Sequence, residues 1–121
     1  MKVFVLEDDP DRIRQLCEWL KGCEWDCVHT CMREGEFNPP YDLILLDHDL
    51  GGRQLIDHED DGVSFVRLIK DRINPEADII IHSYNLEGAK RMQAELKPLQ
   101  SERVPFGPSL RNRIEGRKRK H

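Results

Sequence analysis

Acidic side chains follow two apolar segments of this 121-residue chain. Glu7 and Asp8 come directly after residues 2–6, and Asp47 ends the run DLILLD, with Asp49 two residues further on. Carboxylates that converge repel one another unless a cation lies among them. Mg²⁺ binds one or two carboxylates and keeps waters that phosphate oxygens can replace. The sequence therefore predicts a Mg²⁺ or Mn²⁺ site with Asp8 and Asp47 as ligands, Glu7 acting through a water, and the Asp49 carbonyl completing it.

Two histidines lie beside these strand ends. His48 follows Asp47, and His82 ends the run ADIIIH just before Ser83. Imidazole can carry protons at neutral pH, so two histidines near a metal-held phosphate suit the opening of a cyclic phosphodiester. Either histidine could instead be a capping or hydrogen-bonding residue. The predicted catalytic residues are Asp47, His48, Asp49 and His82, and the predicted phosphate donors are Ser83 and Asn85.

The elements that must position these residues alternate along the chain. Strands are predicted at 2–6, 24–30, 42–47, 77–82 and 103–106. Helices are predicted after Asp9-Pro10, Asp61-Gly62, Asn85 and Ser109. This alternation is typical of an α/β fold with a parallel sheet, in which sites lie at the carboxyl ends of the strands. That edge gathers the carboxylates and histidines named above.

The composition bounds the class of protein. Apolar residues make up 38% of the chain and charged residues 35%, which fits a single domain over residues 1–121. No apolar run approaches the length of a membrane-spanning helix, so no membrane segment is expected. The N-terminal segment turns acidic within a few residues, so we expect no signal peptide and a cytoplasmic location. The four cysteines are expected to be reduced thiols.

Charge is distributed unevenly. Residues 109–121 carry six Lys and Arg against one Glu, a local charge of +5, which leaves −9 on the preceding 108 residues. Residues 115–121 are interpreted as a basic C-terminal tail. Such a tail is either a solvated, frayed end or a contact for nucleic acid.

Four segments, in order, resemble response-regulator receiver domains: VLEDDPDRIRQL, DLILLDHDL, DGVSFVRLIKD and IIIHS. The resemblance implies a flavodoxin-like, doubly wound sheet of five parallel strands in the order 2-1-3-4-5. It also implies that Glu7 and Asp8 are the paired acids, Asp47 the phosphoacceptor and Ser83 the small hydroxyl residue.

The departures from receivers point to one branch of that family. Residues 104–108 lack the lysine that receivers carry after strand five, and the loop around His58 is roughly seven residues longer than usual. The segment between the second and third strands leaves little room for a full helix. The runs DHDL at 47–50 and HSYN at 82–85 resemble the motifs of cyclic-phosphate-processing receiver domains. That resemblance implies a phosphate-containing small molecule or an RNA end as the substrate.

Four functions remain open from the sequence. The first is a metal-dependent phosphoesterase acting on a cyclic or terminal phosphate. The second is a stand-alone receiver phosphorylated on Asp47. A haloacid-dehalogenase-type phosphatase that uses Asp47 and Asp49 is the third. The fourth is a binding domain with no catalysis.

Overall fold

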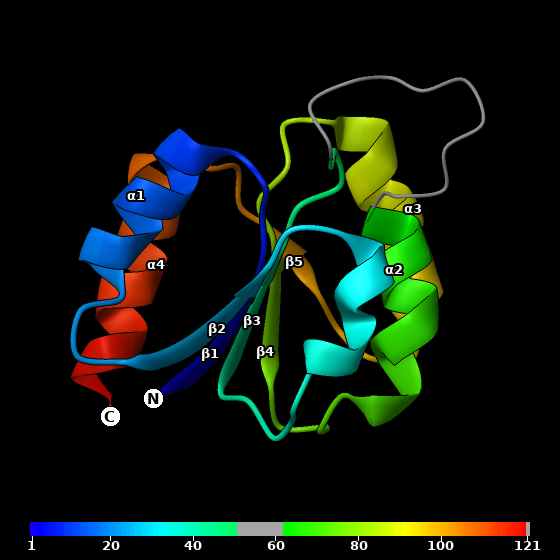
Figure 1. Cartoon of the computed structure of the whole chain (residues 1–121), viewed down its shortest axis with the longest axis horizontal. Coiled ribbons are helices and arrows are strands. Elements are labelled where there is room, and N and C mark those ends of the chain that lie inside the picture. Colours follow the sequence, from blue (N-terminus) through cyan, green and yellow to red (C-terminus); the bar gives the residue numbers. More distant parts are fainter. Residues whose placement is uncertain (51–61, 121) are drawn as a thin grey trace.

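The computed structural model describes residues 1–50 and 62–120, and its elements alternate between strands and helices (Figure 1). In chain order they are β1 Lys2–Leu6, α1 Pro10–Trp19, β2 Glu24–Val28, η1 Cys31–Glu36, β3 Leu43–Leu46, α2 Gly62–Ile69, η2 Lys70–Arg72, β4 Asp78–Ile81, α3 Leu86–Leu96, β5 Glu102–Arg103 and α4 Pro108–Arg119, where η marks a 3₁₀ helix. The five strands form one sheet in the order β2-β1-β3-β4-β5, and every pair is parallel. The predicted doubly wound architecture is confirmed.

Helices cover both faces of the sheet. Figure 1 shows α1 and α4 on one side, and η1, α2 and α3 on the other. The central strands are buried on both faces: Ile44 and Leu46 of β3 join one apolar cluster, whereas Leu43 and Leu45 join the other. This explains the continuous apolar runs in the sequence, since a strand covered on both sides has no solvent face.

Two helices begin at the residues that the sequence predicts. Asp9 caps α1, where its Oδ1 accepts a hydrogen bond from the Asp11 N–H at 2.9 Å. Asn85 caps α3, where its Oδ1 accepts one from the Gly88 N–H at 2.8 Å. Both caps follow a strand end directly, so they fix the first helical turns at the edge where the acidic residues lie.

Only β1 keeps its predicted bounds: β3 and β4 are each shorter by one residue at either end, and β2 and β5 differ more. β2 ends at Val28 rather than at residue 30, and the chain then enters η1 instead of a full helix. β5 is Glu102–Arg103 rather than 103–106. The N–H groups of Val104 and Phe106 still donate to carbonyls of β4 and His82, at 3.0 Å each. Pro105 has no N–H, so the regular ladder ends before it although the chain stays beside β4.

The basic C-terminal segment is helical rather than frayed. α4 begins at Pro108, not at a cap formed by Ser109, and continues to Arg119. Its side chains Leu110 and Ile114 are fully buried, and Arg117 Nη1 lies 2.5 Å from Asp78 Oδ2. Residues 115–119 of the predicted tail thus continue this helix. Within the described residues, no helix has the length and apolar character needed to cross a membrane.

Candidate functional site

A buried carboxylate, Glu7, lies at the centre of the carboxyl edge of the sheet. Its Oε1 is 2.9 Å from His82 Nε2, and its Oε2 accepts hydrogen bonds from the N–H groups of Asp8 and Asp9, each at 3.1 Å. Burial alone would raise the pKa of Glu7. The hydrogen bond and charge of His82, together with the Asp9 N–H and Arg12, outweigh burial and leave that pKa below its usual value. These contacts therefore favour the ionised form of Glu7.

Asp47 sits beside Glu7 at the end of β3. It is buried, and its Oδ1 accepts a hydrogen bond from the His48 N–H at 2.9 Å. Burial, with the neighbouring charge of Glu7, raises the pKa of Asp47 to about 6 although His82, the His48 N–H and Arg12 oppose the shift. Ligand atoms of Glu7, Asp47 and His82 all lie within 4.8 Å of one another. Three separate strand ends thus converge on a set of donors that could hold a metal ion.

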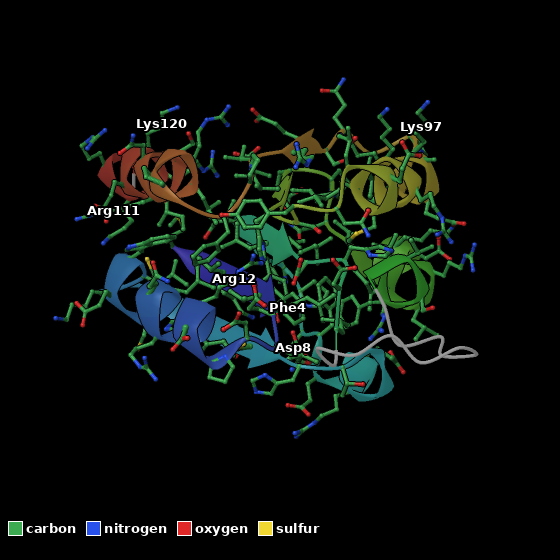
Figure 2. All side chains as sticks on the ribbon, turned by 90° about the horizontal axis from the view of Figure 1, so that it is seen from above. Phe4, Asp8, Arg12, Lys97, Arg111 and Lys120 are labelled. Atoms are coloured by element: carbon green, nitrogen blue, oxygen red, sulfur yellow. The ribbon has the colours of Figure 1, made fainter. Side chains whose placement is uncertain are left out.

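An open cleft of about 490 Å³ lies over this cluster. Its walls are formed by Glu7, Asp8, Asp9, Pro10, Arg12, Asp47, Asp49, Ser83 and Tyr84. Asp8, a predicted metal ligand, is half-buried in this wall, while the ligand atoms grouped together among the described residues belong to the other three side chains. Figure 2 looks down on this edge of the molecule and labels Asp8 and Arg12.

Arg12 is a side chain of the cleft that sequence reasoning missed. Its Nη1 lies 3.6 Å from Glu7 Oε1 and 3.8 Å from Asp47 Oδ2. The signal was present in the helical spacing, because Arg12 shares a face of α1 with the buried residues Leu16 and Trp19. A charged residue on the buried stripe of a helix needs a polar destination, and here that destination is the acidic edge.

The second predicted histidine has different partners. His48 Nδ1 lies 2.7 Å from Asp49 Oδ1, which also accepts a hydrogen bond from Asn85 Nδ2 at 3.2 Å. The imidazole is packed so closely on Gly88 that a Cβ there would lie 2.5 Å from the ring. The structure therefore joins the DHDL and HSYN segments, but it gives His48 and His82 separate surroundings. His58 lies outside the described residues.

Ser83 is almost fully buried at the base of the cleft. Its Oγ accepts a hydrogen bond from the Asn85 N–H at 3.0 Å, which leaves the hydroxyl proton for another acceptor. Asn85 itself is committed on both sides of its amide, since its Oδ1 caps α3 and its Nδ2 reaches Asp49. Of the two predicted phosphate donors, Ser83 lines the cleft and Asn85 positions its neighbours.

This combination defines a class of protein, the receiver domains: a 2-1-3-4-5 parallel sheet with paired acids after the first strand, an aspartate after the third and a hydroxyl after the fourth. The chain belongs to the cyclic-phosphate processing receiver domain family, whose model matches residues 1–98. The search among curated proteins found no match.

Solved receiver domains share the fold. The BeF₃-activated receiver domain of DrrB, from Thermotoga maritima, superposes with a TM-score of 0.68 at 17% identity, over 98% of this chain and 94% of that one. TrrA from the same organism, in complex with Mg²⁺ and BeF, has a TM-score of 0.66 at 20% identity, over 98% of this chain and 96% of TrrA. The receiver domain of a sensor histidine kinase from Pseudomonas aeruginosa, with a magnesium ion in its active site cleft, has a TM-score of 0.65 at 19% identity, over 98% of this chain and 94% of that one.

Proposed function

We propose that this receiver domain is a divalent-metal-dependent phosphoesterase that opens a cyclic phosphate or removes a terminal one. The observation that carries the proposal is the convergence of Glu7, Asp47 and His82 beneath a cleft. A phosphorylated signalling domain needs the carboxylates but not the histidines. The family description, cyclic-phosphate processing, agrees with the added proton-carrying groups.

The donors at the cleft fit Mg²⁺ or Mn²⁺. Glu7 and Asp47 offer carboxylate oxygens, which both ions prefer, and Asp8 lines the same cleft. Solved receivers with this fold hold Mg²⁺ in their active site cleft or bind Mn²⁺. When bound, such an ion supplies positive charge for phosphate oxygens and makes a bound water more acidic.

The protein's own residues divide the remaining work. His82 is a positioning residue, since its Nε2 holds Glu7 from below and it is fully buried. The Ser83 hydroxyl, fixed by the Asn85 N–H, donates to a phosphate oxygen. The exposed Asp49 lines the cleft and contacts His48, so this pair moves the protons. Opening the ring adds one water across a P–O bond: its oxygen joins phosphorus, and the leaving oxygen receives a proton.

The basic segment does not adjoin this site. Figure 1 shows the C-terminal end of α4 at the level of the amino ends of the strands, whereas the cleft residues follow the carboxyl ends of β1, β3 and β4. Arg113, Arg117 and Lys118 are also engaged with Glu102, Asp78 and Glu115 of the protein itself. We therefore propose a small phosphate-containing molecule or the very end of an RNA as substrate, with any contact of the basic segment separate from catalysis.

A phosphodiesterase assay tests the proposal. The native protein is incubated with 2′,3′-cyclic nucleotides and Mg²⁺ or Mn²⁺, and products are followed by phosphorus NMR. We expect a monoester product that requires metal and disappears in Asp47→Asn and His48→Ala. If acetyl phosphate labels Asp47 while every cyclic substrate stays intact, the protein is a signalling receiver and the proposal is wrong.

A further inference from the structure

Two aromatic rings hold the side chain of Arg12 in place. Its guanidinium carbon lies 4.9 Å from the centroid of the Tyr84 ring and 5.1 Å from that of Phe106. Phe106 in turn stacks on Trp19, with ring centroids 4.9 Å apart, and the Tyr84 hydroxyl donates a hydrogen bond to the Phe106 carbonyl. These contacts reduce the number of rotamers open to a long side chain, so the charge is kept over the cleft.

The guanidinium keeps its hydrogen-bonding capacity. Its contacts with Glu7 and Asp47, at 3.6 and 3.8 Å, are longer than hydrogen bonds, and it donates no hydrogen bond to any residue in the described ranges. Its side chain is 20% exposed to solvent. Arg12 therefore faces the cleft with planar N–H groups that are held in position and donate no hydrogen bond to the described residues.

Within the described part of the chain, Arg12 is also the one lysine or arginine among the cleft residues. The end of β5 supplies no alternative, because residues 104–108 contain no basic residue. Arg103 points its guanidinium at backbone instead, with Nε donating to the Ser83 carbonyl at 3.1 Å. Five carboxylates surround the cleft, and their charge repels any phosphate that enters without a cation.

We infer that Arg12 is the phosphate-binding residue of this site, presenting two N–H groups to two oxygens of the substrate's phosphate. The inference rests on the proposed function, since it assigns the substrate contact of that same cleft. Glu7 and Asp47 would hold the metal ion, whose charge would weaken their attraction for Arg12 and leave its N–H groups available to the phosphate. A planar fork matches two phosphate oxygens better than an ammonium group does.

Calorimetry on the full chain separates metal binding from phosphate binding. Mg²⁺ is titrated alone, and then inorganic phosphate and 2′,3′-cyclic CMP are titrated at saturating Mg²⁺. Arg12→Gln should weaken phosphate binding roughly tenfold or more while Mg²⁺ binding is kept or tightened. The phosphate affinity of Arg12→Lys should lie between those of the native protein and Arg12→Gln. The control is Arg14→Gln, which changes an exposed arginine of the same helix that pairs with Asp11.

Each contrary result has a distinct meaning. Unchanged phosphate affinity in Arg12→Gln overturns the role of Arg12 but leaves the phosphoesterase proposal intact. Equal loss of Mg²⁺ and phosphate binding shows that Arg12 only maintains the fold, which also overturns its role. If the native protein with saturating Mg²⁺ binds neither probe, both proposals fail. If Arg12→Gln does not fold, the Tyr84→Leu variant replaces it, because that change removes one aromatic contact of Arg12 and keeps the charge. Unchanged phosphate affinity in both Tyr84→Leu and Arg12→Lys also overturns the assignment.

Discussion

His82 Nε2 and Glu7 Oε1 lie 2.9 Å apart, and both side chains are completely buried. The two residues directly follow β4 and β1, which are not neighbours in the sheet, because β3 runs between them. The contact therefore passes over the end of β3, where Asp47 sits. This pair ties three strand ends together and keeps one carboxylate charged inside the protein.

Removing the imidazole should leave Glu7 as a buried charge with too few partners. We expect His82→Leu to lower the free energy of unfolding by about 3 kcal/mol. Because the pKa of Glu7 is lowered, its contribution to stability is present above its ordinary value of 4.5 and is lost as the pH falls through the lowered one. Urea unfolding between pH 3 and 8 measures both effects. His82→Gln, which can still donate a hydrogen bond to Glu7, is the control; equal stability of the two variants would argue against the hydrogen bond to Glu7 as the source of the stabilisation.

Asp47 should make the native protein less stable as the pH rises. Its pKa is raised from 3.8 to about 6, so the native state binds this proton more tightly than the unfolded chain. The stabilisation is full below the lower value and is lost as the pH rises through the upper one. We expect Asp47→Asn to be more stable than the native protein by about 2 kcal/mol at pH 8, with the gap closing near pH 4. Thermal unfolding of both proteins at pH 4 and pH 8 measures the difference in stability. If Asp47→Asn is less stable than the native protein at pH 8, the prediction is wrong.

Metal binding should compete with the same proton. A ligand carboxylate must be ionised, so the affinity for Mn²⁺ should fall roughly tenfold per pH unit below about pH 6 and level off above it. Calorimetric titrations from pH 5 to 8 give the profile. Asp47→Asn should abolish binding, whereas Asp42→Asn, which changes a carboxylate at the other end of β3, should not. An affinity that is flat across this range would show that Asp47 is not a ligand.

The close packing of Gly88 on His48 predicts that a single methyl group disturbs the site. A Cβ at residue 88 would lie 2.5–2.7 Å from three atoms of the imidazole. We expect Gly88→Ala to cost about 1–3 kcal/mol of stability and to reduce the proposed phosphoesterase activity, since the ring must leave Asp49.

Gly116→Ala provides the matched control for that change. Gly116 is also helical, but its nearest neighbour is a flexible Arg119 nitrogen at 3.9 Å. Alanine should be neutral there or stabilise by up to about 1 kcal/mol. Urea unfolding of both variants, with chemical shifts of the His48 ring, tests the pair. Unchanged stability and shifts in Gly88→Ala would contradict the packing.

The fold followed from local patterns in the sequence. The runs LILL and DIII predict strands covered on both faces, and Asp9-Pro10 and Asn85 mark helix starts at the observed residues. These signals are local: a cap needs only its own first turn, and a doubly covered strand needs only an unbroken apolar run. The carboxyl-edge rule then brought the acidic residues together before any contact was known.

The sequence by itself thus determined the α/β class, the approximate positions of the strands and the edge that carries the carboxylates, and its resemblance to receiver domains implied the strand order. Only the tertiary structure decided that Arg12 enters the site, that His82 supports Glu7 while His48 contacts Asp49, and that a helix, α4, continues to Arg119 in the basic C-terminal segment. The reason is physical. These outcomes depend on side-chain directions and on contacts between residues far apart in the chain, and neither spacing nor composition encodes such distances.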